Sequence, residues 1–278
     1  MSIKKIILPG EYINITDHEY HKYGKPKNRI QIVDSFTQKP IFKDLTNKVV
    51  IAGSAYNAVR ICPSFQPSIL TPSYNTSLSL DNTVSESWTG KGGRDGEFVY
   101  LMCVGNNGCG ADSSQKKEVN YASRIDPSNL VPFQYVAKAN DLNAIQRESY
   151  FGRKAGDSRI AYYFKTWEGT PIFKQQFLDG TAIDENIYTS ERALIDEVES
   201  FIQYTFKITT ADCREYYEQI SSLADAKISQ ISLCSAWTKT IDGYTYYQDI
   251  RPYTLLNFPT ELLIDTDKAF DIIYQVFP

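Results

Sequence analysis

Histidine is scarce in this sequence: among 278 residues there are two, His18 and His21. A mechanism that pairs a serine or cysteine nucleophile with a histidine base would have to use one of them, and the sequence contains no G-x-S-x-G motif. The two histidines lie in TDHEYH, beside Asp17 and Glu19. A helix is not expected there, between a β-like run and a Gly-Pro-Lys loop, so the spacing of three does not bring the rings together. We interpret the pair as solvated or interface residues, with a transition-metal site as the alternative.

The sequence also lacks a basic excess and long apolar runs. Its 29 Lys and Arg against 33 Asp and Glu give a formal net charge of −4, which provides no broad cationic field for nucleic acid or an anionic membrane. No apolar run approaches the roughly 20 residues that span a bilayer. The opening MSIKKIILPG has too short an apolar core for an export signal. We therefore expect a globular protein with no specific nucleic-acid partner and no membrane partner.

The cysteines do not form a disulfide framework. There are five of them, spread along the chain: Cys62, Cys103, Cys109, Cys213 and Cys234. We expect reduced thiols, with Cys103 and Cys234 as small core residues and no disulfide between Cys103 and Cys109. The close pair in MCVGNNGCG has no further ligands nearby, so a zinc site is not predicted.

One glycine-rich block, GKGGRDG at Gly90–Gly96, combines glycines with Lys91 and Arg94. A phosphate-binding P-loop needs four residues between its first glycine and a Gly-Lys-Ser/Thr sequence, followed by a helix. Here an apolar strand follows instead. We interpret the block as a charged surface turn rather than a nucleotide site.

Paired carboxylates are the other candidates for catalysis, because a glycoside hydrolase needs only two. The candidates are Asp184 with Glu185, and Glu191 with Asp196 and Glu197. They lie where we expect the start of a helix and its solvent-exposed face. Acidic residues near a helix N-terminus interact favourably with the helix dipole. We therefore predict no catalytic residue, no cofactor and no bound metal, and the protein is not expected to be an enzyme.

Aromatic residues are abundant, with 20 Tyr, 14 Phe and 3 Trp. Such a composition favours β-rich structure and large interfaces. The clusters YYFKTW, REYYEQ and GYTYYQDIRPY stand out. Because alternation along a strand directs every second ring to the core, we expect about half of these rings to be structural, and some of the rest to lie at an interface.

The N-terminal part of the chain predicts two regions. Residues 1–48 contain the short β-like runs IKKIIL, EYINI and RIQIV and are expected to form an extended arm that contacts other chains more than its own domain. Residues 49–120 are expected to form a small β region. It includes a long exposed connection or a clamp loop at Ser64–Thr89 and a strand at Phe98–Val104 between glycine-rich turns.

Residues 121–278 are expected to form a β-rich assembly domain. The sequence predicts an edge strand or domain connection near the prolines of IDPSNLVPFQYV, and a hairpin that joins RIAYYFKTW to PIFKQQFL through Glu168–Thr170. A short helix running into a strand is predicted in SERALIDEVESFIQYTFKIT, and a second helix after TTAD, with an apolar face that includes Cys213, Tyr217 and Ile220. A strand KISQISLCSAW, a turn at Asp242–Gly243 and a central or closing strand AFDIIYQVF complete the region. The predicted fold class is α+β and β-rich, an antiparallel β-sandwich-like C-terminal domain with one or two short helices.

The C-terminal half resembles structural proteins of tailed bacteriophage particles. The similarity starts near Phe206 and lies in a helix followed by an I-x-x-I-x-L strand, an R-x-x-T-x-x-x-F-P segment and a final D-I-x-Y-x-V strand. The residues that carry it are Ile228, Ile231 and Leu233; Arg251, Thr254, Phe258 and Pro259; and Asp271, Ile272, Tyr274 and Val276. Similar patterns of helix and strand sequence occur in tail, baseplate and head-decoration proteins.

The resemblance implies a structural component of the virion, assembled in the bacterial host cytoplasm. Its place would be the tail, baseplate, collar or head, and its partners would be other virion structural proteins and copies of itself. The abundance of tyrosine and the lack of a catalytic constellation agree with such a role. The alternative is a carbohydrate-binding host-recognition module or adhesin that uses aromatic strands as sugar platforms, and the third function is a glycoside hydrolase.

Overall fold

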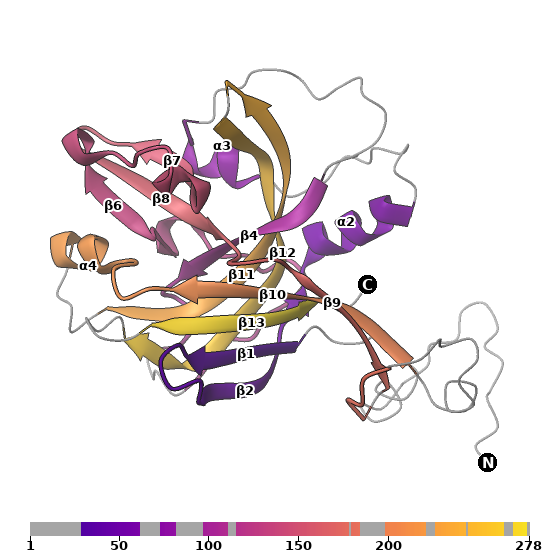
Figure 1. Ribbon diagram of the computed structural model, residues 1–278. Helices are drawn as coiled ribbons and strands as arrows, with labels where there is room; N and C mark the ends of the chain where they lie inside the picture. The colour runs from indigo at the N-terminus through magenta and orange to yellow at the C-terminus, as the bar shows by residue number, and fades with distance from the viewer. Residues whose placement is uncertain are drawn as a thin grey trace, which may run out of the picture.

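Apolar residues on the strands pack two antiparallel sheets face to face as a β-sandwich with few helices (Figure 1). The structure, a computed structural model, describes residues 29–61, 73–81, 97–110, 115–177, 179–183, 198–220, 226–242, 244–263 and 269–276. The β-rich fold class predicted from the sequence is confirmed.

The smaller sheet has five strands in the order β2-β1-β13-β10-β9. Their bounds are β1 Arg29–Asp34, β2 Pro40–Thr46, β9 Ile172–Phe177, β10 Val198–Ile208 and β13 Phe270–Val276. All of its pairings are antiparallel.

The larger sheet has eight strands, six of them in the order β3-β12-β11-β4-β8-β6, with β5 paired to β4 and β7 paired to β8. Their bounds are β3 Lys48–Val49, β4 Glu97–Gly105, β5 Leu130–Val131, β6 Gln134–Ala137, β7 Tyr150–Ala155, β8 Arg159–Thr166, β11 Lys227–Ile241 and β12 Tyr244–Leu263. The long β11–β12 hairpin turns where it was predicted, at Asp242, whose φ of 49° suits a tight turn. The predicted boundary near residue 120 falls within this one sheet, because β4 lies between β11 and β8.

The main core lies between the two sheets. The smaller sheet contributes apolar residues of β1, β10 and β13, and the larger sheet those of β4, β11 and β12. Phe42 of β2 packs on Phe258 of β12 with ring centroids 5.8 Å apart, and Thr254 hydrogen-bonds Tyr274 across the layers. The central members are Ile30, Ile32, Phe206, Ile208, Ile272, Tyr274, Met102, Val104, Ile231, Leu233, Leu256 and Phe258.

The last strand occupies the middle of the smaller sheet, as predicted. On one side β13 pairs with β1 and on the other with β10. Phe270, Ile272 and Tyr274 are buried, while the alternate residues are half-buried. The period-2 pattern therefore identifies the face that packs on the core.

The prediction of an extended arm is wrong for residues 29–46. These residues form β1 and β2, which join the smaller sheet of the same chain. Ile30 and Ile32 are 1% and 0% exposed in the main core, because β13 supplies the backbone partner that a short strand needs. The remaining part of the expected arm, residues 1–28, lies outside the described residues.

The hairpin predicted between residues 159–167 and 171–178 is also wrong. β8 lies in the larger sheet with β4, β6 and β7, and β9 lies in the smaller sheet beside β10. The backbone N–H of Glu168 donates to the carbonyl of Thr205, and Gly169 takes a φ of +68° as the chain crosses between layers. A glycine turn signals that a strand ends but does not fix its partner.

The exposed loop predicted at Ser64–Thr89 is wrong for residues 73–81. They form α3 (Tyr74–Leu78), capped by the Ser73 hydroxyl, and Tyr74 and Leu78 are buried. Together with Leu80, these side chains cover the outer face of the larger sheet in a second apolar cluster. The rest of the predicted loop lies outside the described residues.

The helix α2 (Ile51–Ile61) was not predicted, and it packs closely on β12. A Cβ at Gly53 would lie 2.0 Å from the carbonyl oxygen of Tyr253, so only glycine permits this approach. The ring of Tyr56 meets that of Tyr253 edge-on at 5.6 Å.

The helix predicted after Thr209 is confirmed as α4 (Arg214–Ile220). Cys213 and Tyr217 are buried, as expected of its apolar face, but Ile220 is 52% exposed. The strands predicted at β4, β10 and β11 are confirmed, and β6 lies at an edge of its sheet, as expected. The helix predicted before β10 lies outside the described residues.

Candidate functional site

The connection between β6 and β7 ends in a surface loop braced by its own hydrogen bonds, residues 141–149, which we call the Ile145 loop. Asn143 and Gln146 brace it reciprocally: the backbone N–H of Asn143 donates to Oε1 of Gln146, and the N–H of Gln146 donates to Oδ1 of Asn143, both at 3.0 Å. This exchange satisfies backbone donors at the start of the 3₁₀ turn η3 (Gln146–Glu148). The loop is thus held in one conformation by its own side chains.

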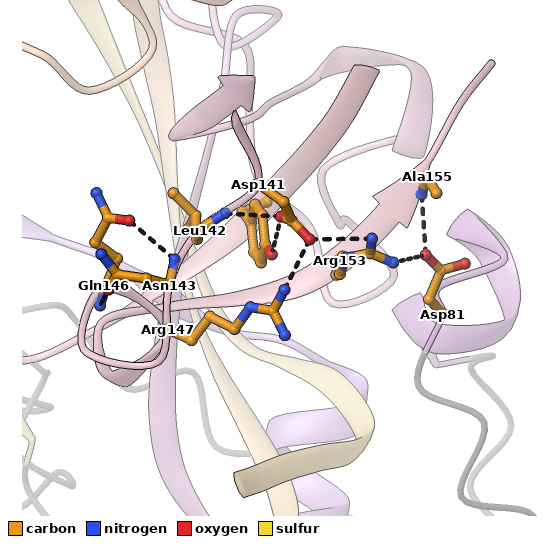
Figure 2. A network of polar contacts seen from close by, with 9 residues as sticks. Asp81, Asp141, Leu142, Asn143, Gln146, Arg147, Arg153 and Ala155 are labelled. Carbon is orange, nitrogen blue, oxygen red and sulfur yellow. Dashed lines mark hydrogen bonds and ion pairs between the residues drawn. The ribbon is translucent and has the colours of Figure 1, made fainter. Parts of the chain in front are cut away.

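Asp141 fixes the base of the Ile145 loop to the larger sheet (Figure 2). Its Oδ1 accepts hydrogen bonds from the Leu142 N–H and the Tyr162 hydroxyl, both at 2.8 Å. Its Oδ2 lies 2.7 Å from a guanidinium nitrogen of Arg147 and 3.2 Å from one of Arg153. One carboxylate therefore joins the loop to both β8 and β7.

Arg153 extends this network to the segment that follows α3. Its other guanidinium nitrogen lies 2.5 Å from Oδ2 of Asp81, which also accepts the backbone N–H of Ala155 (Figure 2). The Asp81 N–H in turn donates to the carbonyl of Arg153. Asp81, 72 residues before Arg153 in the sequence, is therefore linked through two guanidiniums and a second carboxylate to the Ile145 loop.

The network changes the ionisation of its members. Burial alone would raise the pKa of Asp141, but the Tyr162 hydroxyl, the Leu142 N–H and the two guanidiniums outweigh it and lower that pKa below its usual range. Burial and the bond to Asp141 raise the pKa of Tyr162 to about 12, so its hydroxyl stays a donor at neutral pH. Asp141 thus stays a charged acceptor at neutral pH.

The braced loop carries a fully presented apolar side chain. Ile145 is 78% exposed, the highest value among the exposed large apolar residues of the described chain. Since the loop is already ordered, burying Ile145 against a partner would cost little further backbone entropy. The arrangement suits a preorganised contact with another macromolecule.

The turn between β1 and β2 repeats this arrangement at another corner. Oδ1 of Asp34 accepts the N–H groups of Phe36 and Thr37, at 3.1 and 2.7 Å. Ser35 and Gln38 donate to the carboxylate of Asp271 on β13, at 2.6 and 3.0 Å. The turn so fixed presents Phe36, which is 71% exposed.

Lys165 and Asp212 form a buried ion pair between the two sheets. Nζ of Lys165 on β8 lies 2.9 Å from Oδ2 of Asp212, and the two side chains are 3% and 0% exposed. Nζ also donates to the Lys207 carbonyl, and Asp212 accepts from the hydroxyl of Tyr150 and the N–H of Thr209. Every charge in the cluster therefore has bonded partners, as a structural pair requires.

No activated nucleophile is evident in this cluster. Burial, followed by the charge of Asp212, raises the pKa of the adjacent Cys213 thiol well above its ordinary value. The neutral thiol is the unreactive form. Burial and Asp212 likewise raise the pKa of Tyr150, which keeps its proton as a donor.

Most residues weighed earlier as catalytic candidates are not placed by the structure. His18, His21, Gly90–Gly96 and the acids between Asp184 and Glu197 lie outside the described residues. Cys103 and Cys234 are buried core residues with sulfurs 3.8 Å apart, as expected of small apolar side chains, and the Cys109 thiol donates to the carbonyl of Phe258. Cys62 is not described.

The aromatic clusters are largely structural in the part of the chain that can be placed. Tyr162, Phe164, Tyr247 and Tyr253 are 7% exposed or less. By contrast, Tyr121 is 64% exposed, with Nζ of Lys48 4.7 Å from its ring centroid. Burial of alternate rings follows the strand periodicity.

The described helices include none that is long and apolar enough to cross a bilayer. Within the described ranges, no group of three or more His, Cys, Asp and Glu side chains is placed to hold a metal. The chain matches no family model, no curated protein and no solved structure.

Sequence reasoning missed the Ile145 loop. Asn143 and Gln146 have the three-residue spacing of a reciprocal cap, a signal that could have located the turn. The contacts of Asp141 with Tyr162 and Arg153 depend on the pairing of β7 with β8, which the spacing of these residues does not reveal.

Proposed function

We propose that this protein is a structural component of a bacteriophage particle, in the tail, baseplate, collar or head, and acts by protein–protein assembly without catalysis. The observation that carries the proposal is the presentation of Ile145, 78% exposed, on a loop fixed by reciprocal bonds and by Asp141. An exposed apolar residue on a loop that is already ordered can be buried against a partner at little further cost in backbone entropy. The resemblance of the C-terminal half to phage structural proteins is the reason for proposing a phage particle as the assembly.

Phe36 supports the same role from a second corner of the sandwich. Both anchors are held by an aspartate that accepts backbone N–H groups of its own turn. Two separated anchors suit a subunit that contacts more than one neighbour in a symmetric particle. The alternative of a sugar-binding module draws less support, since no described ring in its expected platforms YYFKTW and YTYYQ is exposed: Tyr162, Phe164 and Tyr247 are buried, and the others are half-buried.

The first test is quantitative mass spectrometry of purified particles of the phage that encodes the chain. We expect the protein in every particle preparation. Its copy number should be fixed and roughly a multiple of five, six or twelve, because subunits of a particle are related by rotational symmetry. Absence from purified particles, with abundance in the infected cell, would contradict the proposal.

The second test concerns the anchor. Ile145→Ser removes the exposed apolar group and should leave the melting temperature unchanged, because the side chain packs on little of its own chain. Incorporation into particles, measured by complementation of a deletion phage, should fall at least tenfold. Ile220→Ser is the matched control, since Ile220 is exposed on α4 outside any braced loop. Equal incorporation of both variants and the parent would show that the Ile145 loop is not a contact.

A further inference from the structure

The buried Lys165–Asp212 pair holds a primary amine against a carboxyl group where water has no access. Nζ of Lys165 lies 2.9 Å from Oδ2 of Asp212, and the two side chains are 3% and 0% exposed. An ammonium and a carboxylate together carry the atoms of an amide and one water molecule. The pair can therefore condense without any further reactant.

We propose that Lys165 and Asp212 condense in the folded chain to an amide cross-link between Nζ and Cγ. The two residues are 47 positions apart in the sequence. The bond would tie β8 of the larger sheet to the turn that follows β10 of the smaller sheet. This covalent modification goes beyond the assembly function and does not depend on it.

The partners that the product needs are already in place. Oδ1 of Asp212 accepts from the Tyr150 hydroxyl at 2.7 Å and from Nε2 of Gln134 at 3.3 Å, and it would keep both donors as the carbonyl oxygen of the amide. Nζ of Lys165 donates to the carbonyl of Lys207 at 2.6 Å, a bond that the amide N–H would keep. The polar atoms of the new amide would therefore stay hydrogen-bonded in the interior.

The other carboxylate oxygen, Oδ2, is the one that leaves. One proton passes from Nζ to Oδ2, and the freed electron pair on Nζ attacks Cγ. The electron pair of the carbonyl bond moves onto Oδ1, where Tyr150 and Gln134 stabilise the negative charge by donating hydrogen bonds. A second proton moves from Nζ to Oδ2 through the Thr209 hydroxyl, which lies 3.0 Å from Oδ2. The bond between Cγ and Oδ2 then breaks, the carbonyl re-forms on Oδ1, and one water molecule is released.

Two features of the site favour the amide over the ion pair. Keeping two charges in the interior carries a desolvation cost, and the amide is neutral. Well-oriented groups within one molecule also react as though at effective concentrations of roughly 10⁵ to 10⁸ M, far above that of liquid water. The Lys165 ammonium gives up its proton only to its own partner, so no outside substrate is attacked.

The test is the intact mass of the full-length chain after folding and then denaturation in urea. Condensation should lower this mass by about 18 Da, the mass of one water molecule. Trypsin does not cleave after an acylated lysine, so digestion should yield a branched peptide in which Ile160–Lys174 is joined to Ile208–Arg214. Lys165→Arg is the control that keeps the charge but has no primary amine, and it should retain the full mass of its sequence.

A rate measurement tests the role given to Tyr150. In pulse-labelled chains quenched in urea at successive times, Tyr150→Phe should form the cross-link at least tenfold more slowly, because Oδ1 loses a donor. Tyr163→Phe is the matched control, since the Tyr163 hydroxyl interacts with Tyr135 and Tyr216 instead. Its rate should equal that of the parent.

Two results would overturn the inference. One is a folded parent chain that keeps the full mass of its sequence after prolonged incubation, which means that the ion pair is the final state. The other is a mass loss that maps to an Asp-Gly sequence such as Asp179–Gly180, which means that a succinimide has formed there. Neither result changes the presence or copy number of the protein in particles, so failure here is distinguishable from failure of the assembly function.

Discussion

At the scale of single residues, the stability of the chain depends strongly on each side chain of the buried Lys165–Asp212 pair. Both side chains are almost fully buried, so removing one charge leaves the other unpaired in the interior. We expect Lys165→Met and Asp212→Asn each to lower the free energy of unfolding by about 3 to 5 kcal/mol. Urea titrations of both variants would measure this.

The double variant is the control for that pair. Lys165→Met/Asp212→Asn removes both charges, so its loss should be clearly smaller than the sum of the two single losses. Additive losses would mean that the two charges act independently, despite the 2.9 Å between Nζ and Oδ2.

Asp141 predicts a pH dependence. Its pKa is lower in the folded chain than the ordinary value of about 3.9, so the unfolded state binds the proton more readily. The stability it contributes is present in full above the ordinary pKa and is lost as the pH falls through the lowered folded-state pKa. The difference in unfolding free energy between the parent and Asp141→Asn should be constant down to about pH 5 and shrink below about pH 4.

Urea titrations across that pH range give the measurement, with Asp157→Asn as the control at an exposed aspartate outside the network. The control removes a carboxylate while leaving every bond of the Asp141 network in place. A parent–Asp141→Asn difference that is flat down to the acid transition would mean that the Tyr162 and arginine contacts do not favour the ionised carboxylate.

At the scale of elements, β13 offers a test of which face is buried. Ile272 is 0% exposed in the main core, whereas its neighbour Ile273 points to the other face and is half-buried. Ile272→Asp should place a charge among apolar side chains and yield insoluble or molten protein, a loss of more than about 4 kcal/mol. Ile273→Asp, the same change one residue along, should remain folded with a lower melting temperature. Circular dichroism melts distinguish them, and equal damage would refute the assigned face.

The elements also show what the sequence could and could not predict. Strands such as β10, β11 and β13 were predictable, because alternation depends on which side chains face the core and not on the partner strand. The separation of β8 from β9 was not, since pairing is decided by competition among several strands for the same edge. The helix α2 was not predicted because Val49, Val50 and Ile51 favour strand and Gly53 disfavours helix, whereas the helix packs closely on Tyr253 in the folded chain.

The candidate site was missed for a related reason. Its proposed anchor is Ile145, which differs from the other isoleucines in how exposed its side chain is. Exposure is a property of the folded chain and is not visible in the sequence. The bracing of Asp141 by Arg153 and Tyr162 likewise depends on strand pairing.

At the scale of the whole molecule, the two parts of the predicted arm should behave differently. Deleting residues 1–28 leaves every described strand in place, so we expect a folded protein with an unchanged melting temperature that joins particles poorly. Deleting residues 1–48 also removes Ile30 and Ile32, each worth about 1.5 to 3 kcal/mol of burial. Together with the loss of β1 and β2, this should prevent cooperative unfolding in calorimetry. A cooperative transition in the longer deletion would show that β13 and β10 hold the smaller sheet alone.

The order of strands in the smaller sheet has a consequence for synthesis on the ribosome. β1 is made early, yet the strand that fills the gap between it and β10 comes much later: Ser35 and its partner Asp271 are 236 residues apart. Throughout translation of the intervening chain, the edge of β1 that pairs with β13 has no permanent partner, and it is open to premature pairing with other nascent chains. Chaperone dependence should therefore end only when β13 clears the exit tunnel, which makes the closing of this sheet the step that commits each newly made chain to its native form.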